Sequence, residues 1–323
     1  MTLSSNYHSS NLNIDQIHVQ SSLHHFIFSY RITNQVIIKQ SSFTNMLASA
    51  ISLSSKSEYN NQNFTEPLIK KGKKNVTCIH CIFKNCKNRI GEKGGALQTV
   101  QCSTSLIYCI FIDNFATFSG SVEIQDAPIG IVNYTLIIKS SAERFGAMML
   151  DGHEVTDIGN IYYSNFTENK AEKWIGGVRL QHNGGNIKFS NFVKNSAQSY
   201  GAIWDYGYKP AYRELDHLYI LNNTASDIGA GFTSFHLLFI GTANQCVFYG
   251  NRNSNGFKGR SILVHSYSSS MNVKNCYFEG EKDTEMTTYF IESTLKDEGT
   301  NSFNSNNLTL EDIFNINNVI NNV

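Results

Sequence analysis

The sequence predicts a right-handed parallel β-helix, an all-β solenoid of about 8–10 coils with about 28 residues per coil. Three observations carry this prediction. A large apolar residue returns at steps of 26 to 30 positions, polar residues keep the same phase, and the runs between them have the composition of strands. The apolar column consists of Phe83, Phe111, Ile137, Phe166, Phe192, Ile220, Phe248 and Phe278.

The neighbours of this column repeat with it. Three residues downstream, asparagine recurs at Asn114, Asn169, Asn195, Asn223 and Asn251. We expect the apolar column to stack inside the solenoid and the asparagines to mark a corner. Asparagine tolerates a left-handed backbone there, and its amide can bond the amide of the next coil. Glycine at the following corner allows a positive φ and a close backbone approach.

Short strands, not helices, connect these columns. The apolar positions lie two or three apart in runs rich in Ile, Val, Phe, Tyr and Thr, and Asn, Gly and Ser interrupt the runs. After each glycine, alternate residues such as Val122 and Ile124 share one face of a second run. Propeller blades repeat at about 40 residues and sandwiches need no repeat, so a parallel β-helix is favoured over both.

The repeat resembles that of a known family. Its best copies are Phe111 to Asn114, Phe166 to Asn169 and Phe192 to Asn195, combined with Gly-Gly-Ala-aliphatic segments such as Gly94 to Leu97. Over residues 78 to 281 this pattern is similar to the polymorphic outer-membrane-protein family and its protist surface relatives, within the pectin-lyase-like superfamily. The resemblance implies a secreted or surface adhesin-like role, although many copies here lose the double glycine.

The chain divides into three parts by the regularity of the repeat. We expect irregular N-terminal coils or a cap over residues 1–77, with a lysine-rich surface loop around Lys70 to Lys74. Regular repeats occupy residues 78–281, and degenerate coils occupy residues 282–323. All three parts belong to one solenoid, because each repeat packs only on its neighbours.

The net charge and the targeting signals limit which classes of partner and which cellular locations are expected. Lys plus Arg equals Asp plus Glu at 26 each, and this neutral balance argues against a nucleic-acid partner. The start at Met1 has no signal-peptide pattern, and no run approaches the ~18 apolar residues of a membrane span. Taken literally, this indicates a soluble intracellular protein, which conflicts with the surface role that the resemblance implies. The localisation therefore stays open between these two.

The seven cysteines allow two interpretations. Cys81 with Cys109, and Cys246 with Cys276, occupy one inward column in neighbouring coils, at a spacing that a disulfide accepts. Ser164 fills the same column, so a ladder of buried small residues with free thiols is the simpler interpretation. A metal site is not expected, since Cys78 and Cys81 have no second well-spaced ligand pair. No cofactor is indicated.

One outward patch is the candidate binding site. On the strand after the glycine, outward positions of four successive coils combine carboxylates, a guanidinium and two aromatic rings. Such a mixture suits sugars, whose ring faces pack on aromatic side chains and whose hydroxyls bond charged groups. The predicted binding residues are Glu123, Asp151, Arg179, Trp204 and Tyr206.

The predicted function is recognition of a glycan or of a host or cell-surface protein along the outer face of the rod, without catalysis. The alternative is a polysaccharide lyase or glycoside hydrolase of the pectin-lyase-like class, since such enzymes keep their sites on an outer face. No paired Asp-Asp, Gly-His-Gly or Arg-x-Lys motif occurs at matching positions, so no catalytic residue is assigned.

Asp205 departs from the pattern. It falls at a position where Ile124 and Leu150 point inward. Either Asp205 is buried and paired, or a register shift near Tyr206 turns it outward, and we favour the shift because burying a carboxylate is costly.

Overall fold

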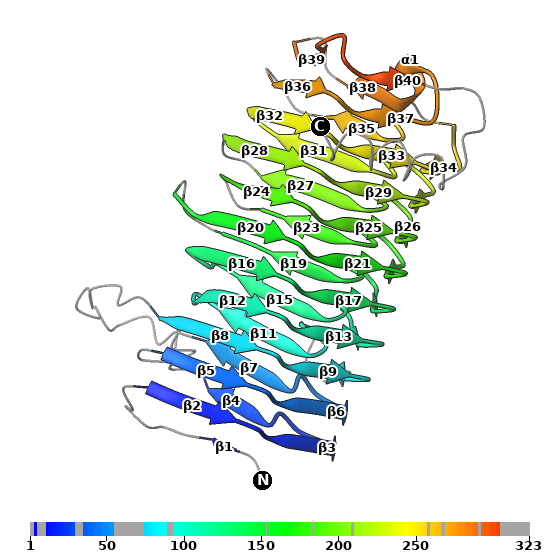
Figure 1. Cartoon of the computed structure of the whole chain (residues 1–323). Coiled ribbons are helices and arrows are strands. Elements are labelled where there is room, and N and C mark those ends of the chain that lie inside the picture. Colours follow the sequence, from blue (N-terminus) through cyan, green and yellow to red (C-terminus); the bar gives the residue numbers. More distant parts are fainter. Residues whose placement is uncertain are drawn as a thin grey trace, which may run out of the picture.

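The computed structural model describes residues 3–4, 11–29, 35–54, 74–88, 93–152, 154, 156–181, 184–207, 210–256, 259–265, 269–289 and 292–303. It confirms the parallel β-helix of about 28 residues per turn (Figure 1). Every strand pair is parallel, and four sheets run along the rod. Within the described ranges, the single helix is the short α1 (Lys282–Glu285) near the C-terminal end.

Three sheets have 11 strands each, and a fourth has seven. Sheet 1 contains β1 (Leu3–Ser4), β4 (Ile27–Ser29), β7 (Ile51–Ser54), β11 (Leu97–Val100), β15 (Val122–Gln125), β19 (Met148–Leu150), β23 (Val178–Leu180), β27 (Ile203–Gly207), β31 (Phe232–His236), β35 (Ile262–Val264) and β38 (Met286–Thr288). Sheet 2 contains β2 (Asn11–Asp15), β5 (Gln35–Lys39), β8 (Asn75–Ile79), β12 (Ser103–Ile107), β16 (Ile129–Asn133), β20 (Ile158–Tyr162), β24 (Gly184–Lys188), β28 (Ala211–Asp216), β32 (Phe239–Asn244), β36 (Ser270–Lys274) and β39 (Thr294–Asp297).

The other two sheets are built from shorter strands. Sheet 3 contains β3 (His18–Ser22), β6 (Ser42–Met46), β9 (Ile82–Lys84), β13 (Ile110–Ile112), β17 (Leu136–Ile138), β21 (Asn165–Thr167), β25 (Asn191–Val193), β29 (Tyr219–Leu221), β33 (Val247–Tyr249), β37 (Tyr277–Phe278) and β40 (Ser302–Phe303). Sheet 4 contains β10 (Lys87–Asn88), β14 (Phe115–Ala116), β18 (Ser141–Ala142), β22 (Lys170–Ala171), β26 (Ser196–Ala197), β30 (Thr224–Ala225) and β34 (Arg252–Asn253). A complete coil therefore passes through sheets 2, 3, 4 and 1 in that order.

Parallel pairing continues on both sides of residues 78–281. It extends to β2 and β3 at the N-terminal end and to β39 and β40 at the C-terminal end. Of the lysine-rich segment, Lys70, Lys71 and Lys73 lie outside the described residues. No helix in the described part of the chain is long and apolar enough to cross a membrane.

The predicted apolar column is the centre of the core. Its members lie in the middle of the sheet 3 strands, directly above one another, and all are fully buried. The rings of Phe83 and Phe111 stack with centroids 4.7 Å apart, and those of Phe166 and Phe192 with centroids 4.9 Å apart. The period seen in the sequence is thus the period of the stack, because each coil adds one strand to every sheet.

The buried asparagines form the predicted amide ladder. The Asn169 amide donates to Asn195 Oδ1 at 3.0 Å, Asn195 donates to Asn223 at 3.0 Å, and Asn223 donates to Asn251 at 3.1 Å. The prediction of their backbone was one residue off, since the left-handed residue is the one before each asparagine. Asp113, Glu168 and Lys194 occupy that position, with φ of 54° to 55°, and Lys139, which precedes Ser140 of the same column, has a φ of 55°.

The left-handed residue leaves its side chain outside, while the asparagine that follows turns inward, where its amide satisfies backbone groups of the adjacent coil.

Glycine is needed at its corner for contact between coils. A Cβ on Gly95 would lie 1.9 Å from the carbonyl oxygen of Gly120, and one on Gly120 would lie 2.0 Å from that of Gly146. None of these three glycines has a positive φ, so close approach alone explains them.

Asp205 is buried and paired, and the predicted register shift does not occur. β27 pairs in register with β23, which places Asp205 beside Leu180 and inside the solenoid. Arg213 donates from Nε to Asp205 Oδ2 at 2.9 Å and from an NH2 group to Oδ1 at 3.0 Å. His236 Nε2 lies 3.0 Å from Oδ1. The bidentate pairing offsets the cost of burial that had favoured the shift.

Glycines in neighbouring coils make room for this cluster. A further NH group of Arg213 lies 3.2 Å from the carbonyl oxygen of Gly184, and the register partners of Arg213 in the two neighbouring coils, Gly185 and Gly241, carry no side chain. The pKa of Asp205 is held below its usual range: burial acts to raise it, but the charges and hydrogen bonds of Arg213 and His236 outweigh that effect.

All seven cysteines lie in the described residues, are buried, and form no disulfide. This agrees with the simpler interpretation of the cysteine column. His80 is exposed and turned away from Cys78 and Cys81, on the corner between sheets 2 and 3. Across the ranges that the structure describes, no three metal-ligating side chains gather at one point.

Candidate functional site

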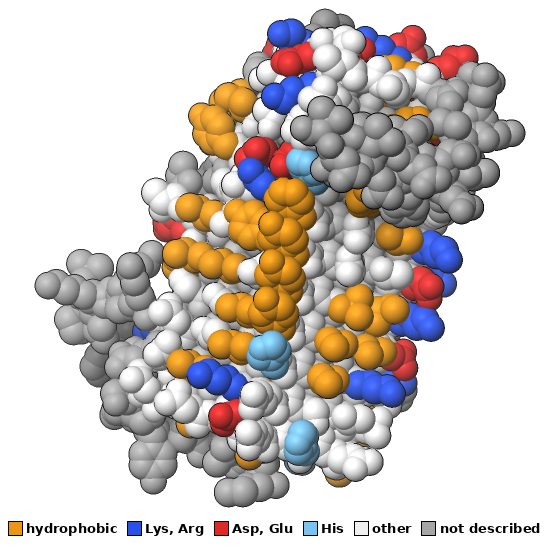
Figure 2. Space-filling view, in the orientation of Figure 1, with side chains coloured by type: hydrophobic (Ala, Val, Ile, Leu, Met, Phe, Trp, Pro, Cys, Tyr) orange, Lys and Arg blue, Asp and Glu red, His pale blue; other side chains and the backbone are white. Residues whose placement is uncertain are grey.

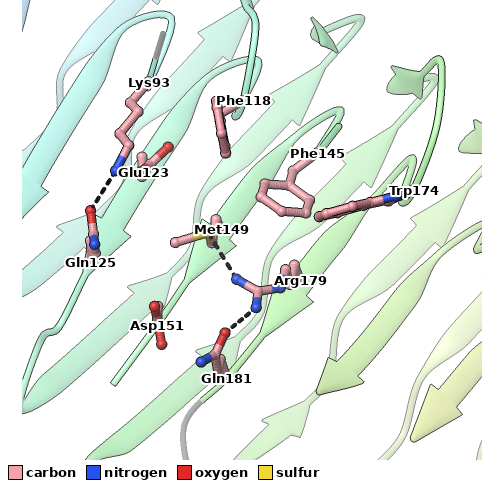
Figure 3. A pocket seen from close by; sticks show the side chains of 10 residues that line it. All are labelled: Lys93, Phe118, Glu123, Gln125, Phe145, Met149, Asp151, Trp174, Arg179 and Gln181. Carbon is pink, nitrogen blue, oxygen red and sulfur yellow. Dashed lines mark hydrogen bonds and ion pairs between the residues drawn. The ribbon is translucent and has the colours of Figure 1, made fainter. Parts of the chain in front are cut away.

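The outer face of sheet 1 carries a hollow of about 270 Å³ (Figure 3). Its floor comes from β15, β19 and β23, whose outward residues Glu123, Met149 and Arg179 lie in register in three successive coils. A second outward row, two residues further along each coil, supplies Gln125, Asp151 and Gln181. Strand alternation explains both rows, because the residues between them point into the core.

Aromatic side chains wall the hollow on one side. Phe118, Phe145 and Trp174 come from the segments that connect sheet 4 to sheet 1 in consecutive coils. Phe145 packs with Met149, Ile175 and Trp204 in a small apolar cluster separate from the main core. Figure 3 shows the three rings lined up beside the strands, with the polar side chains on the other side of the hollow.

Glu123 is the most constrained group of the site. Its side chain is fully buried, and Ser119 donates a hydrogen bond to Oε2 at 3.0 Å. Its other oxygen, Oε1, accepts no hydrogen bond from the described residues, and the nearest cation is Lys93 Nζ at 3.7 Å. Burial raises the pKa of Glu123, although Lys93, Ser119 and Arg179 oppose the rise. The carboxyl group is therefore easier to protonate than an exposed glutamate.

Arg179 is held by rings as well as by polar atoms. Its guanidinium carbon lies 5.1 Å from the centre of the Phe145 ring, 5.5 Å from that of Trp204 and 5.3 Å from that of Tyr206. One NH group lies 3.1 Å from the sulfur of Met149, and another donates to Gln181. Contacts of this kind fix the orientation of the cation over the floor of the hollow.

Lys93 lies at the end of the hollow nearest to β11. Its ammonium donates to Gln125 at 3.0 Å, beside Glu123. It also lies 5.8 Å from the centre of the Phe118 ring. The hollow thus combines two cations, two carboxylates, two side-chain amides and three rings from four successive coils.

The structure brings the five predicted residues together on one face. Glu123, Asp151 and Arg179 line the hollow, while Trp204 and Tyr206 pack beside Arg179 in the next coil. Although these residues point outward, three of them are largely buried, since Glu123 is 0%, Asp151 8% and Trp204 8% exposed. Packing against the neighbouring rings removes much of this face from water.

The sequence analysis missed the wall and Lys93. A signal was present for one wall residue, Phe145, which shares its repeat phase with Ile175 and Tyr200, apolar residues that also directly precede a corner glycine. These residues pair as a ladder of single bridges in the structure. Lys93 lies in an irregular segment before β11, and no repeat phase marks it.

We also compared the chain with known proteins. No family model, no curated protein and no solved structure matches it.

Proposed function

We propose that the protein is a non-catalytic, adhesin-like recognition module that binds a glycan in the hollow on sheet 1. The observation that carries the proposal is the buried Glu123 carboxyl, whose Oε1 lacks a hydrogen bond from the described residues and lies in a hollow walled by three aromatic rings. An unsatisfied buried oxygen is costly, and a ligand hydroxyl would satisfy it.

The chemistry of the lining favours a sugar over an apolar ligand. One side presents aromatic surface for the C–H face of a pyranose, and the floor presents carboxyl, amide and cationic groups for hydroxyls. A volume of about 270 Å³ lies just below the usual range for drug-sized ligands. We therefore expect one sugar residue of a longer glycan to enter, with its neighbours lying on the sheet outside.

The test is binding of the purified chain to a glycan array, followed by titration calorimetry with the best ligand. Glu123→Gln keeps the shape of the side chain, and we expect it to weaken binding at least tenfold because an amide cannot replace a carboxyl acceptor on every hydrogen bond. Ile240→Ala, on the outer face of sheet 2, is the matched control and should bind as the wild type does. Equal affinity of Glu123→Gln and wild type would refute this site.

One observation favours a second candidate, glycoside hydrolysis. Glu123 has a raised pKa, as a general acid requires, and Asp151 offers a second carboxylate in the same hollow. The two residues are one coil and two positions apart, so their Cα atoms are about 8 Å from each other. New reducing ends released by the wild type, and lost in Glu123→Gln, would support this candidate against pure binding.

A further inference from the structure

The outer face of sheet 3 is apolar on β13 and β17, whereas Asn165, Thr167 and Asn191 point outward on β21 and β25. The outward residues of β13 and β17 are Ile110, Ile112, Leu136 and Ile138, and the inward ones are Phe111 and Ile137. From β13 to β37 no outward residue of the sheet carries a charge. A parallel sheet that is apolar on both sides is normally covered on both sides.

A column of stacked rings borders this face. His80, Tyr108, Tyr134, Tyr163, Phe189 and His217 occupy the left-handed corner between sheets 2 and 3, with ring centres 4.7 to 5.0 Å apart. Figure 2 shows the column as a continuous apolar ridge, with further apolar side chains on the sheet beside it. Four of these rings are 41% to 47% exposed.

The ridge and the sheet together present a large part of the area that one partner contributes to a standard interface. With about 200 Å² per ring, the four exposed rings alone present about 350 Å², and the outward isoleucines and leucine add to this. One partner in a standard interface contributes about 800 Å². Since the rings stack face to face, they offer their edges to a partner, which disfavours the ring-on-face contacts that sugars make.

Charges on the opposite border indicate which partner fits. The left-handed corner between sheets 3 and 4 carries Asp113, Lys139, Glu168 and Lys194 in successive coils, all exposed. Their signs alternate along the rod, and the Lys139 ammonium lies 3.9 Å from the Glu168 carboxylate. An alternating row read in the opposite direction is its own complement, whereas a parallel two-fold copy would place the charged row opposite the ring column, where the charges find no partner.

We propose that the outer face of sheet 3 binds the same face of a second copy of this chain, in an antiparallel two-fold arrangement. The axis passes between the coils of β17 and β21. Asp113 then faces Lys194 of the second copy, and Lys139 faces Glu168 of the second copy. Such an isologous contact is closed, so it yields a dimer and not a fibre.

Sedimentation analysis of the full chain tests this proposal. We expect the wild type to be a dimer and Leu136→Glu to be a monomer, because a charge would be buried in the centre of the contact. Ile240→Glu places the same charge on an exposed position of sheet 2 and should leave the dimer intact. Circular dichroism melting of each variant separates loss of the dimer from loss of folding.

A charge exchange tests the antiparallel register. Asp113→Lys places two lysines opposite each other at both ends of the contact, and we expect the dimer dissociation constant to rise about tenfold. Adding Lys194→Asp should restore it to within about twofold of wild type. The two residues are three coils, about 14 Å, apart within one chain, so a contact inside the chain cannot explain a rescue.

Three results would overturn the proposal. One is a wild-type chain that stays monomeric at its highest soluble concentration. Another is a double exchange that remains as weak as Asp113→Lys alone. The third is a chain that dimerises only after residues 304–323 are removed, which would assign the face to a segment of the same molecule.

Discussion

Asp205 and Glu123 are both fully buried carboxylates on strands of sheet 1, three coils apart, yet their surroundings differ. Asp205 faces the interior and meets a bidentate arginine and a histidine, so both oxygens are bonded. Glu123 faces outward and has one bonded oxygen, with the nearest cation 3.7 Å from the other.

The difference separates a structural charge from one available to a ligand. A completed buried pair contributes little net stability, but it becomes very costly when one partner is removed. A buried oxygen without a hydrogen bond destabilises the folded protein, and a ligand that donates a hydrogen bond to it removes this destabilisation on binding. The opposite pKa shifts of the two groups express the same contrast, since Asp205 is stabilised as the anion and Glu123 as the neutral acid.

The largest effect is expected at Asp205. Asp205→Asn leaves the Arg213 guanidinium buried without a counter-charge, and we expect a loss of about 3–5 kcal/mol in the free energy of unfolding. Chemical denaturation at neutral pH measures it. Glu143→Gln, which removes an exposed ion pair with Lys173, is the control and should change stability by less than about 0.5 kcal/mol. A small loss at Asp205 would mean that the pair is dispensable.

Low pH should reduce the difference in unfolding free energy between wild type and Asp205→Asn. The pKa of Asp205 is lower in the folded state, so its contribution is present above the unfolded pKa of about 3.9 and is lost as the pH falls toward the lower folded value. We expect the stability gap between wild type and Asp205→Asn to narrow steadily below about pH 4. Denaturation curves of both proteins between neutral and acidic pH measure the gap, and a constant gap would contradict the assignment.

Substitution of Glu123 should change the free energy of unfolding by less than substitution of Asp205, and in the opposite direction. Its folded pKa is raised, so its contribution is fully present below the unfolded pKa of about 4.3 and is lost as the pH rises through the folded value. At neutral pH, Glu123→Gln should therefore stabilise the protein by about 1 kcal/mol while weakening ligand binding. The gain should disappear in acid, and a destabilised variant at neutral pH would show that the carboxylate is fully compensated.

Much of the fold could be predicted because equivalent positions of the repeat have the same surroundings in every coil. The stack of Phe83 and Phe111 and the ladder from Asn169 to Asn251 both follow from residues that recur in phase. Asp205 could not be placed, because its partners Arg213 and His236 occur once and lie in other strands. The surroundings of a residue that occurs in one coil alone cannot be inferred from the other coils.

For the site, the residues on the strands could be predicted, whereas those in the connecting segments could not. Strand alternation placed Glu123, Asp151 and Arg179 on one outer face, and the structure brings them into one hollow. Their burial depends on Phe118, Phe145 and Trp174 in the connecting segments, whose side-chain directions are not set by strand alternation. The left-handed corners were missed by one residue because Lys139, Glu168 and Lys194, of residue types that are not typical at positive φ, occupy several of them.

The aromatic wall has one practical consequence. The chain contains two tryptophans, Trp174 and Trp204, and both lie at the hollow with ring centres 5.9 Å apart. Trp174 is 39% exposed, whereas Trp204 is 8% exposed and stacks on Tyr200. Intrinsic tryptophan fluorescence therefore originates at this site alone, and its emission maximum and quenching report entry of a ligand without any attached dye.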